Sequence, residues 1–277
     1  MIGDDEQVEP RLSVADLMQE DLLQPQPSLA QPPILEYRSE EGKEKKHFST
    51  LFIGHYGSGH CFLTTLFVLE MKERLIFSVS PGGKTPPFSS KTHASNLQQI
   101  SLFTSEHFSN CAFLSIGFAI PDELSRIYIR TILGALSFDN VVTLGHTDSF
   151  SLQQSTTLKE IPEEPSLFYV STSKYPATNL SSLNIAHLDS PPVLSGVPAV
   201  VLSYCEARGI PAVSVLTVLT DSLLSSTNLL ACLPVLHPPF LESQTAAAHF
   251  EKTPEMISTF KQTVRASSFG KGNTLFT

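Results

Sequence analysis

Apolar residues recur at helical spacing between residues 122 and 136, and this stretch is the clearest helix signal in the chain. The stripe consists of Leu124, Ile127, Tyr128, Ile132 and Leu136. Short uncharged runs rich in apolar residues are typical of strands instead. They occur at residues 50–53, 76–79, 97–103, 111–118, 141–144, 167–170 and 213–218. The pattern predicts a prominent helix among several short strands.

The most regular unit lies at residues 197–219. Val200, Tyr204 and Ala207 share one face of a helix predicted over residues 199–207. Gly209 follows where a helix C-cap is expected. The uncharged β-branched run after it is typical of a strand covered on both faces. A helix that leads into a buried strand is a unit of an α/β sheet, and this one contains no catalytic motif.

Three further helices are predicted, over residues 60–72, 220–230 and 253–267. The helix at 220–230 is expected to be capped near Asp221, and Thr253 is a good N-cap for the last helix. Two segments are dense in turn-forming residues and predict loops, at residues 81–95 and 171–192.

This alternation of strands and helices predicts a single, three-layer-like α/β domain with a largely parallel sheet over residues 48–269. Residues 1–47 are acidic and rich in proline, which predicts disorder. Within them, residues 12–23 have amphipathic spacing and would form either a transient helix without a partner or a docking motif. Two glycines in residues 270–277 predict a flexible C-terminal tail.

Charge and cysteine content narrow the function classes. The net charge of −9 argues against a nucleic-acid binder, which would usually carry a basic face. The four cysteines are widely spaced without a CxxC pair, which predicts buried free thiols in a reducing compartment. No apolar run approaches the ~18 residues of a membrane span. The acidic N-terminus has no apolar signal-peptide core, so a cytosolic or nuclear protein is expected.

The glycine-rich segment Gly54–His60 is the strongest candidate for enzyme chemistry. A glycine-rich turn between a strand and a helix can offer backbone N–H groups to a phosphate. The segment has neither the G-x-G-x-x-G spacing nor the Gly-Lys-Ser/Thr of a P-loop, however. A tight turn is therefore the favoured interpretation.

Histidines suggest two other kinds of site, and the sequence lacks the motif of each. His47, His55 and His60 lack the spacing of a metal site, so no metal is expected. His146 follows a strand, with Asp148 and Ser151 close by in sequence, but no G-x-S-x-G nucleophile elbow exists. An ordinary loop at the end of a strand is the favoured interpretation.

The last residues, Leu275, Phe276 and Thr277, pair two apolar side chains with the terminal carboxylate. Such an end is either frayed, as termini commonly are, or captured by a partner.

Two segments resemble the proteasome assembly chaperone family, and specifically its chaperone 1 branch. They are Pro198–Cys205 followed by Gly209–Ala212, and the tail Asn273–Thr277. The resemblance implies a non-catalytic α/β sandwich similar to purine nucleoside phosphorylases. It also implies a heterodimer with an assembly chaperone 2-like subunit, which holds proteasome α subunits during ring formation and blocks off-pathway α-ring dimers.

The family's tail, a hydrophobic residue, a Tyr and a final residue, inserts between neighbouring α subunits. The resemblance therefore assigns partner binding to Leu275, Phe276 and Thr277, with Phe276 in place of the Tyr. Two function classes follow. The first is a non-enzymatic chaperone for assembly of the proteasome core particle, without a cofactor. The alternative is an α/β enzyme or nucleotide-binding protein that uses Gly54–His60 and His146.

Overall fold

The computed structural model describes residues 34–36, 47–67, 71–80, 99–105, 108–148, 166–176, 180, 183, 185–188, 194–219, 224–236, 240 and 254–266. Most of the N-terminal region 1–47, the whole tail 270–277 and the predicted loop at 81–95 lie outside this part of the chain. The domain boundaries at 47/48 and 269/270 therefore stay predictions.

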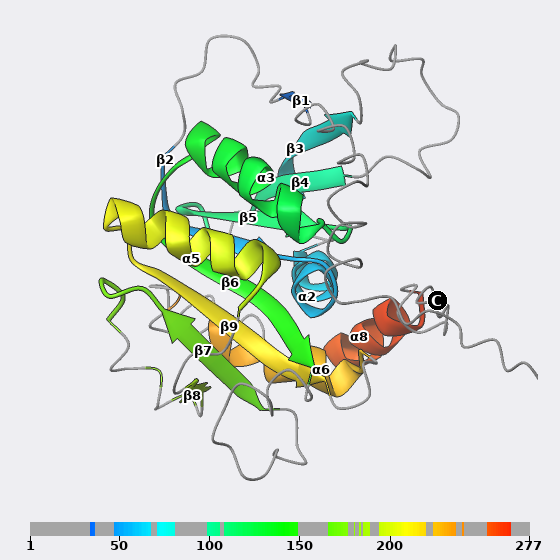
Figure 1. Ribbon diagram of the computed structural model, residues 1–277. Coiled ribbons are helices and arrows are strands. Elements are labelled where there is room, and N and C mark those ends of the chain that lie inside the picture. Colours follow the sequence, from blue (N-terminus) through cyan, green and yellow to red (C-terminus); the bar gives the residue numbers. More distant parts are fainter. Residues whose placement is uncertain are drawn as a thin grey trace, which may run out of the picture.

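The described strands form one sheet in the order β1-β3-β4-β5-β2-β6-β9-β7-β8 (Figure 1). Their bounds are Ile34–Glu36 (β1), His47–Gly54 (β2), Met71–Ser80 (β3), Gln99–Ser105 (β4), Cys111–Ile116 (β5), Ser137–Asp148 (β6), Leu167–Ser171 (β7), Ile185–His187 (β8) and Ala212–Leu219 (β9). The central strands β5, β2, β6 and β9 run parallel to one another. Antiparallel pairs flank them on both sides, through β4 and β7. The predicted α/β fold is confirmed, and its parallel part is the centre of the sheet.

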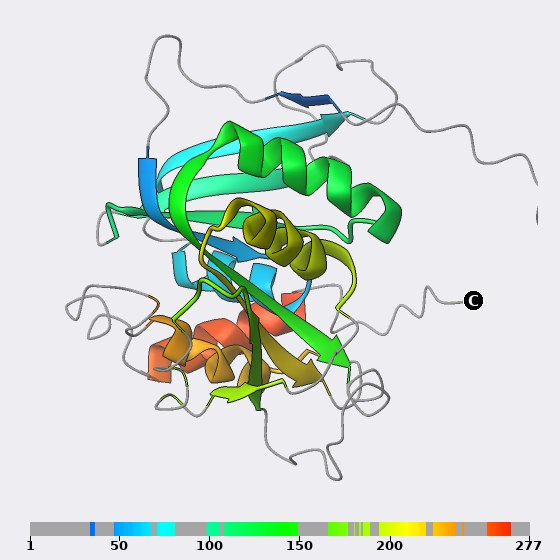
Figure 2. The same ribbon diagram turned by 60° about the vertical axis from the view of Figure 1, so that its left-hand side comes forward.

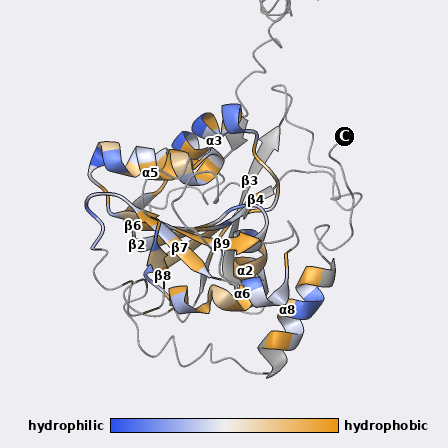
Figure 3. Cartoon of the chain, turned by 60° about the horizontal axis from the view of Figure 1, so that its bottom comes forward, coloured by the Kyte–Doolittle hydropathy of each residue, from blue (hydrophilic) through white to orange (hydrophobic). Residues whose placement is uncertain are grey.

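Helices cover both faces of this sheet. On one face lie α3 (Asp122–Ala135) and α5 (Gly196–Arg208). On the other lie α2 (Ser58–Phe67), α6 (Ser226–Ala231) and α8 (Pro254–Ala266), with a short 3₁₀ turn at Leu233–Leu236 after α6. Figures 2 and 3 show these two helical layers with the sheet between them. Within the described residues, no helix is both long and apolar enough to cross a bilayer.

Side-chain alternation along the central strands divides the core into two. In β2, Leu51 and Ile53 pack toward the α3/α5 layer, whereas Phe52 packs toward the α2/α6/α8 layer. Phe52 stacks on Phe113 of β5 with ring centroids 5.2 Å apart. Every residue of β9 is buried. Because both faces are covered, the central strands appear in the sequence as continuous apolar runs.

The predicted unit at 197–219 is present as α5 and β9. Gly209 has φ 65° and ψ 28°, and its N–H donates to the carbonyls of Cys205 and Glu206 at the end of α5. This left-handed conformation favours glycine at a helix C-terminus. The buried side of α5 is formed by Val197, Pro198, Val201 and Cys205, while Val200 and Tyr204 are only partly buried.

Other boundaries and faces also differ from the predictions. The helix predicted over 60–72 ends at Phe67, because Met71 already begins β3. The cap of α6 is Ser225, whose side chain accepts from the Asn228 N–H, and not Asp221. Strand β8 lies within the segment predicted as a loop at 171–192. In α3, Ile127 faces solvent, since the core side passes through Ser125, Tyr128, Ile129, Ile132 and Leu133.

All four cysteines, Cys61, Cys111, Cys205 and Cys232, are buried free thiols, as predicted. Burial raises the pKa of Cys61 to about 11, and that of Cys205 and Cys232 to about 12. At neutral pH these three thiols are protonated and behave as small apolar side chains.

Candidate functional site

The carboxyl ends of the central strands bring the predicted Gly54–His60 turn next to His146. The turn leaves β2 and enters α2, and the His55 N–H donates to the Leu144 carbonyl of β6 at 3.1 Å. His146 lies two residues further along β6, and because this strand continues to Asp148 the loop predicted at His146 is wrong. In open α/β sheets ligands usually bind at this edge, so these residues occupy the place where chemistry would be expected.

Two histidines at this edge, His55 and His60, have a lowered pKa. The rings of His55 and His146 stack, with centroids 6.1 Å apart. Burial, together with the charge of a protonated His146, lowers the pKa of His55 to about 3. His60 is hydrogen-bonded through Nδ1 to the Ser115 hydroxyl at 2.7 Å, and burial also lowers its pKa. Neither His55 nor His60 is therefore suited to act as a cationic acid near neutral pH.

The glycines at this edge provide space for these side chains and for the neighbouring strand. A Cβ on Gly145 would lie 1.4 Å from His55 Nε2, and one on Gly57, which has φ +95°, would lie 2.3 Å from the His146 ring. A Cβ on Gly59 would lie 1.9 Å from the carbonyl oxygen of Leu144. Packing thus accounts for the glycines, and it supports the interpretation as a tight turn.

The turn uses some of its backbone N–H groups inside the fold, and its serine hydroxyl is enclosed. The N–H groups of His55, His60 and Cys61 donate to backbone carbonyls, so they do not point at a phosphate. Ser58 Oγ is buried without a hydrogen-bond partner, and so is His55 Nε2. A nucleophilic serine needs a hydrogen-bonded base. Ser151, which was considered together with His146 and Asp148, lies outside the described residues.

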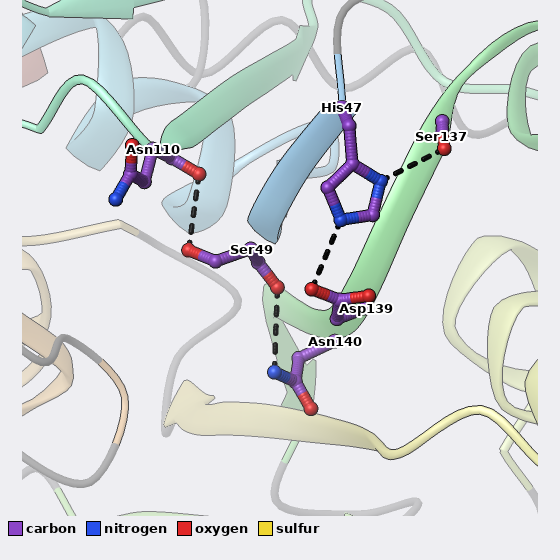
Figure 4. A network of polar contacts seen from close by, with 6 residues as sticks. All are labelled: His47, Ser49, Asn110, Ser137, Asp139 and Asn140. Carbon is purple, nitrogen blue, oxygen red and sulfur yellow. Dashed lines mark hydrogen bonds and ion pairs between the residues drawn. The ribbon is translucent and has the colours of Figure 1, made fainter.

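The three histidines considered for a metal site are not brought together. His47 begins β2, at the opposite end of the strand from His55, about 25 Å away. Figure 4 shows its ring between Ser137 and Asp139 of β6 at 2.9 and 3.0 Å. No group of three or more potential ligands that could hold a metal ion exists among the described residues.

A groove that the sequence did not predict lies on the outer surface of the α3/α5 layer. Its volume is about 690 Å³. The lining residues are Arg126, Arg130 and Gly134 of α3, and Ala199, Val200, Ser203, Tyr204, Ala207 and Arg208 of α5. The face predicted from Val200, Tyr204 and Ala207 therefore forms one wall of this groove. The signal in the sequence was an arginine pair at i, i+4 beside small residues at i, i+4, i+8.

The predicted tail residues Leu275, Phe276 and Thr277 lie outside the described residues, and α8 is the last described element before them. Helix α8 is packed against the rest of the domain. Phe260 is fully buried and stacks on Phe62 of α2 with centroids 6.0 Å apart. The hydroxyl of Thr65 also donates to that of Thr263 at 2.9 Å. Helix α8, which ends at Ala266, is thus fixed in the α2/α6/α8 layer.

Comparison with known proteins identifies the fold. No family model matches the sequence, and no curated protein matches it significantly. Solved structures do match. PbaA of Pyrococcus furiosus, an archaeal homolog of proteasome-assembly chaperone, aligns with a TM-score of 0.56 at 10% identity, over 80% of this chain and 93% of PbaA.

Two further structures have the same architecture. PbaB of Pyrococcus furiosus, an archaeal proteasome activator, aligns with a TM-score of 0.55 at 12% identity, over 83% of this chain and 94% of PbaB. A Thermoplasma acidophilum protein of unknown function aligns with a TM-score of 0.51 at 12% identity, over 80% of this chain and 88% of its own. At such identities the likeness shows a shared fold.

Proposed function

We propose that this chain is a non-enzymatic chaperone for assembly of the proteasome core particle. The observation that carries the proposal is the fold shared with PbaA over nearly all of that chain. An independent feature supports it, because the segment that resembles the chaperone family, residues 198–212, forms most of α5 and the start of β9.

In this proposal the chain forms a heterodimer with an assembly chaperone 2-like subunit. The pair holds proteasome α subunits while the α ring forms and blocks off-pathway α-ring dimers. It works where proteasomes assemble, in the cytoplasm and the nucleus. No cofactor takes part. The enzyme alternative is disfavoured, since His55 and His60 are neutral and the glycine turn is filled by side chains.

The tail supplies the proposed contact with the α ring. Leu275 and Phe276 act as apolar anchors between neighbouring α subunits, and the Thr277 carboxylate pairs with a cation there. Helix α8, the last described element before the tail, is packed on α2. Phe276 keeps the aromatic ring of the family's Tyr but lacks its hydroxyl.

Truncation of the tail tests this assignment. Burying one such anchor contributes about 1.5–3 kcal/mol. Deletion of residues 275–277 is therefore expected to weaken α-ring binding by about tenfold or more in a direct titration. Phe276→Ala should have a similar effect, and Phe276→Tyr should keep or strengthen binding.

The heterodimer provides the internal control, because its interface is expected on the folded domain. Capture of the chaperone 2-like subunit should be equal for the full chain and the truncated chain. Unchanged α-ring affinity after truncation would show that the tail is a frayed end. Failure of the full chain to bind either the α ring or the second chaperone would overturn the proposed function itself.

A further inference from the structure

The groove between α3 and α5 combines positive charge with a floor of small residues. Arg126 and Arg130 are one turn apart on α3, and Arg208 stands on the opposite side at the end of α5. All three side chains are exposed, and none has an ion pair within the described part of the chain. Arg208 is held over the Tyr204 ring, 4.3 Å from its centroid. In a chain with a net charge of −9, this is a local surface for an acidic ligand.

The shape of the groove suits a helix. Gly134, Ala199, Ser203 and Ala207 carry small side chains, which allow the backbone of another helix to approach closely. The stretch from Ala199 to Arg208 is about 14 Å long, or between two and three helical turns. A short helix with an apolar stripe and acidic flanks would therefore match both the size and the charge of this surface.

The chain itself contains such a segment. We propose that residues Leu12–Leu23 dock into the α3/α5 groove of the same molecule. In a helical conformation Val14, Met18 and Leu22 would form one apolar stripe at i, i+4, i+8. The acidic residues Asp16 and Glu20 lie beside that stripe. Residues 1–33 contain seven acidic side chains and one basic side chain, which complements the three arginines.

The connection to the sheet makes intramolecular docking geometrically feasible. Strand β1 begins at Ile34, pairs with β3 and lies next to α3. The ten residues 24–33 contain four prolines and would span about 31 Å in an extended conformation. Helix α3, with 14 residues, is about 21 Å long. The linker can thus reach the whole groove, at an effective concentration in the millimolar range.

A second copy of the chain fits this surface less well. A two-fold contact through the groove would bring the arginines of two copies into one interface. Like charges brought together in this way are unfavourable. The groove therefore favours an acidic occupant over its own equivalent.

Amide hydrogen exchange on the full chain tests the proposal. Exchange at residues 12–23 is expected to be slowed by about tenfold or more, in a salt-sensitive manner. The double variant Arg126→Glu/Arg130→Glu should remove this protection, and adding Asp16→Arg/Glu20→Arg should restore part of it. Lys261→Glu, an exposed charge reversal on α8, is the matched control and should leave the protection unchanged.

The outcomes separate the possible occupants. Protection that stays the same on tenfold dilution supports docking within one molecule, whereas protection lost on dilution points to a second copy and overturns the proposal. Unprotected amides at residues 12–23, or protection insensitive to the arginine reversals, overturn it as well. The α-ring titration with the tail variants is read separately, so the proposed function and this inference can fail independently.

Discussion

The two ends of strand β2 each carry a histidine, and the two environments are opposite. At the amino end, the side chain of His47 is 56% exposed and lies beside the carboxylate of Asp139, which is 61% exposed (Figure 4). Beyond the carboxyl end, His55 Nε2 is buried against the backbone of Gly145, and its pKa is lowered to about 3. The amino end of β2 is exposed to solvent and should tolerate substitutions, whereas the carboxyl end is closely packed.

This difference shows why the presence of histidines and glycines did not by itself indicate a catalytic or binding site. Histidines beside a glycine-rich turn suggest a phosphate or metal site. At the closely packed end, however, the glycines make room for imidazoles and for the carbonyl of Leu144. The polar end, in turn, only links neighbouring strands through surface hydrogen bonds. Three changes test this contrast.

The largest effect is expected from Gly59→Ala at the packed end. Alanine normally stabilises a helix relative to glycine by up to about 1 kcal/mol. Here the new Cβ would lie 1.9 Å from the carbonyl oxygen of Leu144, so strand and helix would have to separate. We expect a loss of several kcal/mol in the free energy of unfolding, measured by urea titration.

Gly134→Ala in α3 is the matched control for this change. Nothing lies within 4 Å of its Cβ position, so this substitution should be neutral or slightly stabilising. Equal effects of the two substitutions would show that the packed end is not constrained.

A smaller effect is expected at His55 as the pH falls. Its folded pKa of about 3 lies below the ordinary value of 6.5, so below pH 6.5 the unfolded chain binds a proton that the folded chain does not. Stability should therefore fall between pH 6.5 and about 3, with an upper bound of about 1.4 kcal/mol per pH unit. Since the residue is partly exposed, the measured slope should be below that bound.

Comparison with His55→Asn isolates this contribution. The difference in unfolding free energy between the original chain and the variant should shrink or change sign as the pH is lowered through this window. A difference independent of pH would contradict the buried, neutral state of His55.

The smallest effect is expected at the solvated end. Asp139→Asn removes the charge beside His47, and exposed pairs of this kind contribute about 0.2–1 kcal/mol. We expect a loss of at most that size in the free energy of unfolding, measured by thermal unfolding at low salt. No loss is expected at 1 M salt because of screening. A loss as large as that of Gly59→Ala would show that the two ends are equally constrained.

The sequence was informative where a single local rule decides the structure. Gly209 at the end of α5, the uncharged run of β9 and the helix at α3 were predictable, because glycine caps, continuous apolar runs and helical spacing act locally. The parallel centre of the sheet followed from the alternation of these elements.

What escaped prediction depends on neighbours that are distant in sequence. The spacing of Ile127 and Val200 fits a helix, but only the position of the sheet decides that Ile127 faces solvent and Val200 lines the groove. Strand β8 is three residues long and forms by pairing with β7, so it has no apolar pattern of its own. The meeting of His55 with Gly145 likewise joins residues about 90 positions apart in the chain.

The modification rates of the four buried cysteines can report how fast each layer of the core opens. Cys205 is on the buried side of α5 and faces the core under the α3/α5 layer, while Cys61, Cys111 and Cys232 belong to the core on the opposite side. A thiol reagent can modify each of them only when the surrounding helices move away. Cysteine-resolved modification rates would therefore show which helical layer detaches first, and whether a binding partner slows one layer without affecting the other.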